Sequence, residues 1–85
     1  MRTAQQHRID RSLIRVMGNM GDNLLPDGVL RDEIEMCAHP RPTQSEIDDA
    51  IRHADMNKRI IGVRTETGVK WKLTDAGRAW AAENL

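Results

Sequence analysis

The chain has 85 residues, of which 39% are hydrophobic and only 2% aromatic, and its formal net charge is zero. This length leaves room for one core. The amino terminus lacks the apolar centre of a signal peptide, and no apolar run approaches the ~18 residues that cross a bilayer. One cysteine cannot cross-link a small fold. We therefore expect a single cytoplasmic domain over residues 1–85, held together by packing alone.

The zero net charge conceals an uneven distribution along the chain. Residues 1–20 hold four basic and one acidic side chain, residues 21–57 hold three and nine, and residues 58–85 hold six and three. The middle is therefore acidic, whereas both ends are basic. Such asymmetry indicates surfaces for charged partners, although domains that bind nucleic acid usually show a basic excess overall.

The first segment predicts a helix, because apolar residues recur at helical spacing from Ile9 onward. Thr3 and Gln6 have the spacing of a capping box at its start, and Gly18 and Gly21 mark its end. The stretch "NLLP" then predicts a short extended piece, since the residue before a proline is pushed out of the helical region.

Two further helices are predicted in the acidic middle of the chain. One covers "DGVLRDEIEMCAH", with Leu30, Ile34 and Cys37 in one apolar stripe, and we interpret Cys37 as a small core residue. "HPRP" prevents its continuation. The next helix covers residues 44–57, begins at the capping box of Thr43 and Glu46, and turns its apolar residues inward, namely Ile47, Ala50, Ile51 and Ala54.

From Ile60 the apolar period changes from helical to two, which predicts a hairpin. "IIGVRT" and "VKWKL" flank the three-residue connection "ETG". With that connection, we expect Arg64, Lys70 and Lys72 to share one basic face, opposite the apolar residues of both strands. A last helix begins at the capping residue Thr74 and is expected to dock through Ala76, Ala79 and Trp80.

This order of elements resembles a winged helix-turn-helix domain, an α+β and mostly α fold with a three-helix core, a two-stranded wing and a carboxy-terminal helix. The resemblance covers roughly residues 8–83 and is sharpest at "WKLTDAGRAW", which is similar to the "L-T-x-x-G-R" segment of many bacterial and phage proteins of this superfamily. It implies that residues 44–57 form a recognition helix for the major groove and that residues 60–73 form a wing beside the DNA backbone.

The resemblance implies a small non-catalytic protein that binds double-stranded DNA, as a transcriptional or phage regulator. Gln44, Ser45 and Arg52 are the candidates for the major groove. Five basic residues are the candidates for phosphate contacts, at the end of the same helix and on the wing: Lys58, Arg59, Arg64, Lys70 and Lys72. The alternative reading is that such cations only cap a helix or keep an exposed strand soluble.

Three carboxylates in the first two turns of the third helix, Glu46, Asp48 and Asp49, argue against DNA, because they would repel a phosphate backbone. The rival hypothesis is therefore a winged-helix interaction module that docks a basic protein surface on its acidic middle, as a regulator or inhibitor of a host nucleic-acid machine. A homodimer through the first and last helices is a further arrangement, which an exposed Trp80 would favour.

Catalytic and metal sites find little support in the sequence. Cys37 and His39 supply two ligands at most, whereas structural zinc sites need four. Glycine-rich phosphate loops and nucleophile elbows are absent from the chain. We therefore expect no enzyme activity, no metal and no cofactor.

Overall fold

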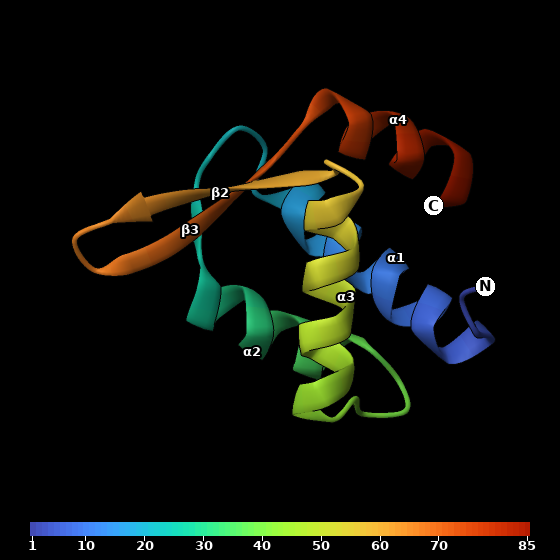
Figure 1. The fold of residues 1–85 in the computed structure, drawn as a ribbon. Helices are drawn as coiled ribbons and strands as arrows, with labels where there is room; N and C mark the ends of the chain where they lie inside the picture. The colour runs from blue at the N-terminus through green and yellow to red at the C-terminus, as the bar shows by residue number, and fades with distance from the viewer.

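The computed structural model describes residues 1–85 and contains four helices and one antiparallel sheet of three strands. The elements follow in the order α1 (Ala4–Asn19), β1 (Leu25–Pro26), α2 (Asp27–Cys37), α3 (Gln44–Met56), β2 (Ile60–Thr65), β3 (Gly68–Leu73) and α4 (Asp75–Asn84). The fold class is α+β and mostly helical, as predicted. The layout is compatible with a winged-helix arrangement, with the β2–β3 hairpin projecting from the helices (Figure 1).

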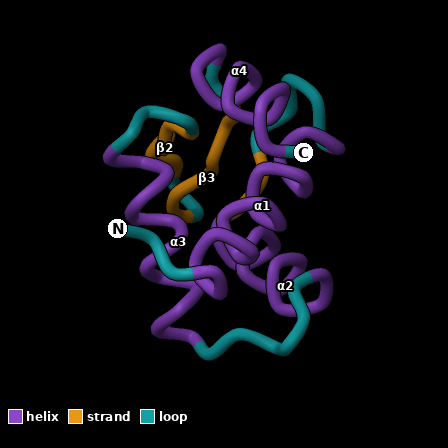
Figure 2. Tube along the Cα trace, turned by 90° about the vertical axis from the view of Figure 1, so that its right-hand side faces the viewer, coloured by secondary structure: helices purple, strands orange, loops and turns teal.

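α1 is the central element, because it contacts each of the other three helices. In the side view of Figure 2 it lies between α2 and α3, with α4 at one end. Its capping box is confirmed: Thr3 accepts from the backbone N–H of Gln6, and the Gln6 side chain accepts from that of Thr3. Its apolar stripe is fully buried at Ile9, Leu13 and Met17 and forms the middle of the core.

The buried stripe of α2 differs from the predicted one at its end. Leu30 and Ile34 are buried, but Cys37 is exposed, so the interpretation of Cys37 as a core residue is wrong. Ala38 takes the inward place instead. The reason is the end of the helix: α2 ends at Cys37, and the extended backbone of Ala38 (φ −87°, ψ 134°) takes the chain out of the helix with Ala38 on its inner side.

α3 agrees with the sequence prediction at both its start and its buried side. Thr43 and Glu46 form the expected capping box, and the four predicted inward residues are all buried.

α4 differs from the sequence prediction in the residues through which it docks. It docks through the buried Gly77 and through Trp80 and Ala81, whereas Ala76 and Ala79 are exposed, so those two predicted contacts are wrong. Gly77 is required there because a Cβ atom would lie 2.2 Å from the Arg59 carbonyl oxygen.

β3 lies between β1 and β2 in the sheet. β1 is the short extended piece predicted at "NLLP", and its Leu25 pairs with Trp71 of β3. The hairpin pairs Ile60 with Leu73 at its base and Thr65 with Gly68 at its tip, which makes the connection two residues long. Gly68 therefore belongs to β3, where its φ of 121° suits a residue without a side chain.

Candidate nucleic-acid interface

The solvent-facing side of α3 carries the three residues predicted for the major groove. Gln44, Ser45 and Arg52 are all exposed. The Gln44 amide donates to Glu35 of α2 at 3.0 Å, and Ser45 lies near the start of α1, in a shallow polar depression. Arg52 makes no hydrogen bond or ion pair within the chain. It is therefore the cation of this helix that is available to a partner.

Three of the four carboxylates of α3 are engaged within the protein, whereas the fourth, Asp55, is exposed and forms no ion pair. Glu46 accepts from the Thr43 backbone N–H at 2.9 Å in the capping box. Asp48 forms an ion pair with Arg31 of α2, and Asp49 lies 2.7 Å from the guanidinium of Arg2. Because a neighbouring guanidinium partly offsets Asp48 and Asp49, the helix repels an anionic partner less than its sequence suggests, although Asp55 keeps its full charge.

Both arginines that pair with α3 also hold a second carboxylate. Arg31 bonds Asp27, one helical turn before it, at 2.8 Å. The hydrogen bond to Asp27, and to a smaller extent the one to Asp48, raises the pKa of Arg31. Arg2 bonds both oxygens of the buried Asp10, at 2.6 and 2.9 Å, and that contact raises the pKa of Arg2. The two arginines therefore stay charged and fix the sides of α3 to α1 and α2.

The predicted basic face of the wing does not exist, because its three cations are divided between two faces. Arg64 pairs with Val69, whereas Lys70 pairs with Val63 and Lys72 pairs with Ile61. Directly opposed residues of an antiparallel ladder point to the same side, so Arg64 lies opposite the two lysines. The cause is the two-residue connection: a connection shorter by one residue shifts the register and exchanges the faces.

Of the two faces of the β2–β3 hairpin, the one with Arg64 turns toward α3. Arg64 lines a shallow depression together with Asp55, near the end of α3, and with Gly62 and Trp71. The Trp71 ring lies close to Gly62, where a Cβ atom would come within 3.0 Å of it, and the indole N–H donates to Asp27 at 2.9 Å. Arg64 and Arg52 therefore belong to one side of the molecule, and Lys70 and Lys72 to another.

Lys58 and Arg59 follow α3 but differ in availability. Lys58 is exposed and has a φ of 59°, the left-handed conformation that often ends a helix. The Arg59 guanidinium stacks 4.7 Å above the Trp80 ring, and burial lowers the pKa of Arg59. His7 contacts the same ring edge-on, with centroids 5.8 Å apart. Trp80 is therefore half-buried, so the exposed Trp80 that would favour a homodimer through α1 and α4 is not found.

Sequence reasoning did not predict the ion pairs that Arg2 and Arg31 form with α3, which reduce the negative charge of the candidate site. The spacing of Asp27 and Arg31 is that of a helical ion pair and was a usable signal. The contact from Arg2 to Asp49 joins residues 47 positions apart, and nothing in the sequence indicates it.

No three side chains of His, Cys, Asp or Glu lie together as metal ligands would. None of the four helices has the length and hydrophobicity that crossing a membrane requires. Neither a protein-family model, nor a curated protein, nor a solved structure matches this chain.

Proposed function

We propose that this chain is a small non-catalytic winged-helix protein that binds double-stranded DNA, as a transcriptional or phage regulator. α3 is the recognition helix and enters the major groove, and the β2–β3 hairpin is the wing. Gln44, Ser45 and Arg52 face the base edges, and Arg64 contacts the backbone beside them.

The observation that carries this proposal is the pairing of Asp48 with Arg31 and of Asp49 with Arg2. These ion pairs partly offset two of the three aspartates that would otherwise keep α3 away from phosphates, because each arginine also holds a second carboxylate. Asp55 has no such partner, and Arg52 also remains unpaired on the same exposed side. Lys58 extends this surface at the end of α3. Lys70 and Lys72 leave the proposed DNA surface, since they lie on the other face of the wing.

Two double variants with the same loss of charge test the proposal. One is Arg52→Ala with Arg64→Ala, and the matched control is Lys70→Ala with Lys72→Ala. We expect the arginine variant to weaken binding to a mixed-sequence duplex and to lower the salt dependence of the binding constant by about one unit, because Arg64 is its phosphate contact and each lost phosphate contact removes about one. The lysine variant should keep most of that salt dependence.

Equilibrium titration of a labelled duplex at several salt concentrations measures both quantities. Binding weaker than about 10⁻⁴ M at low salt would contradict the proposal, because even non-specific DNA-binding proteins reach that range at physiological salt. A larger loss in the lysine variant than in the arginine variant would also contradict it, since the DNA surface would then lie on the other side of the wing.

The second candidate is a winged-helix interaction module that binds a basic protein surface on the acidic middle segment. Asp32 and Glu33 of α2 favour it, because both are exposed and neither forms an ion pair. Asp48 and Asp49 favour it less, since arginines already offset them. Charge reversal at Asp32 and Glu33 should abolish partner binding under this candidate and leave DNA binding unchanged under the first.

A further inference from the structure

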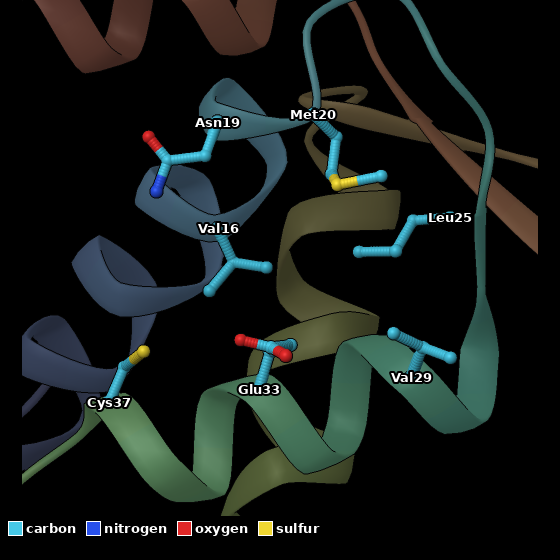
Figure 3. Close-up of a pocket in the computed structure, with 7 residues that line it drawn as sticks. All are labelled: Val16, Asn19, Met20, Leu25, Val29, Glu33 and Cys37. Carbon is cyan, nitrogen blue, oxygen red and sulfur yellow. The ribbon is translucent and has the colours of Figure 1, made fainter.

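An apolar groove opens between α1, β1 and α2 (Figure 3). Its volume is about 240 Å³, and none of its lining residues comes from α3. The lining consists of Val16 and Asn19 of α1, Met20 just after it, Leu25 of β1, and Val29, Glu33 and Cys37 of α2. The groove is therefore separate from the proposed DNA surface.

The groove has the size and chemistry to take apolar side chains next to a cation. It is smaller than the ~300–1,000 Å³ of sites for drug-sized ligands. Val29 remains 44% exposed at its edge, and Glu33 is its only carboxylate and has no ion-pair partner. An occupant that presents one or two aliphatic side chains flanked by a positive charge would satisfy both features.

The outer face of the wing presents that combination. Ile61 and Val63 are 52% and 39% exposed and lie two positions apart, on the same face of β2. They pair with Lys72 and Lys70, so all four side chains lie on one face of the hairpin. Neither lysine forms a hydrogen bond or an ion pair within the chain.

We propose that the wing of one copy of this chain docks in the groove of a second copy. Ile61 and Val63 enter the apolar groove, and Lys70 and Lys72 approach Glu33. Within one chain the two surfaces do not meet, because the hairpin projects away from the helices (Figure 1) while the groove lies between α1 and α2. Such a contact joins two different surfaces and is therefore head-to-tail.

A mixing experiment tests this arrangement. Val63→Glu alters only the wing, and Val29→Glu alters only the groove, both at partly exposed positions where the fold should be kept; circular dichroism checks the fold. The natural protein should gain mass with concentration between about 1 μM and 1 mM in sedimentation equilibrium. Each variant alone should stay monomeric. The mixture should form a one-to-one complex, because one intact wing and one intact groove remain.

Charge reversal tests the same contact in a second, independent experiment. Glu33→Lys should weaken self-association by about tenfold or more, and Lys70→Glu with Lys72→Glu should restore it in the same chain. A natural protein that stays monomeric up to about 1 mM would overturn the proposal, and so would folded variants whose mixture forms no complex. Since these measurements contain no nucleic acid, their outcome does not depend on DNA binding.

Discussion

The guanidinium of Arg2 lies 2.7 Å from the carboxylate of Asp49, across 47 positions of the chain. This contact ties the segment before α1 to α3. The same guanidinium bonds both oxygens of Asp10, which is buried. One side chain therefore neutralises a buried charge and fixes the position of the proposed recognition helix.

Replacing Arg2 with alanine should destabilise the protein by about 1–3 kcal/mol, because Asp10 would lose its charged partner in a buried place. Urea unfolding measures the change. Arg8→Ala is the matched control, since Arg8 is exposed and bonds only the nearby Gln5, and it should change the free energy of unfolding by less than about 0.5 kcal/mol. Equal effects of the two substitutions would show that the Arg2 contact contributes nothing.

Gly77→Ala should destabilise the protein by about 1–3 kcal/mol, because its methyl group would collide with the Arg59 backbone and with Leu73. Gly18→Ala is the control, as the added Cβ atom has no neighbour within 4 Å. Gly18 lies inside α1, so alanine should stabilise it by up to about 1 kcal/mol. Thermal unfolding followed by circular dichroism compares the two. A Gly77→Ala protein as stable as the parent would contradict the close contact of α4 with the start of β2.

Trp71→Phe should cost about 1 kcal/mol at neutral pH, because Asp27 loses a hydrogen bond. Burial raises the pKa of Asp27, but the hydrogen bonds from Trp71 and Arg31 outweigh it, so the pKa lies below its ordinary value. The resulting stabilisation is present above the unfolded pKa of about 4 and is lost as pH falls through the folded value.

The effect of Trp71→Phe should therefore shrink in acid, as measured by urea unfolding between pH 2 and pH 7. Asp27→Asn supplies the control, since its amide oxygen still accepts from the indole but does not titrate. That variant should lack the same part of the pH dependence. A constant difference between Trp71→Phe and the parent at all pH values would mean that the indole does not affect the ionisation of Asp27.

His53 should make the protein less stable in mild acid. Burial, and then the positive charges of Arg2 and Arg59, lower the pKa of His53 below 6.5, although Asp10 and Asp49 oppose this. The unfolded chain therefore binds the proton more readily. This contribution to the free energy of unfolding is fully present above pH 6.5, the ordinary pKa, and is lost as the pH drops through the folded pKa. His53→Gln should remove this decline when unfolding is measured between pH 5 and pH 8. An unchanged decline would assign it to another group.

Local signals predicted most of the helical fold. The capping boxes at Thr3 and Thr43 and the stripes of α1 and α3 each depend on residues three or four positions apart, where spacing determines contact. Each error came from a shift of one residue along the chain. A two-residue connection in place of three moved Arg64 to the opposite face of the hairpin, and the end of α2 at Cys37 turned the next residue, Ala38, into the core.

The charge of the candidate site could not be predicted, because it depends on contacts between distant segments. The composition of residues 44–57 indicates an acidic helix, yet Arg2 and Arg31 come from outside that segment. Spacing along one helix reveals nothing about a guanidinium that arrives from another. A sum of charges over a segment is therefore a poor guide to the potential at its surface.

The two tryptophans are built-in optical reporters for opposite parts of the molecule. The chain has no tyrosine, so its near-ultraviolet emission comes from Trp71 and Trp80 alone. Trp71 lies where the wing meets α2, and Trp80 lies between His7 and Arg59, where α4 meets α1. In the Trp71→Phe protein, the remaining emission reports on the packing of α4 against α1. In a Trp80→Phe protein, it reports on the contact between the hairpin and α2. Movement at either end can thus be observed without an attached dye.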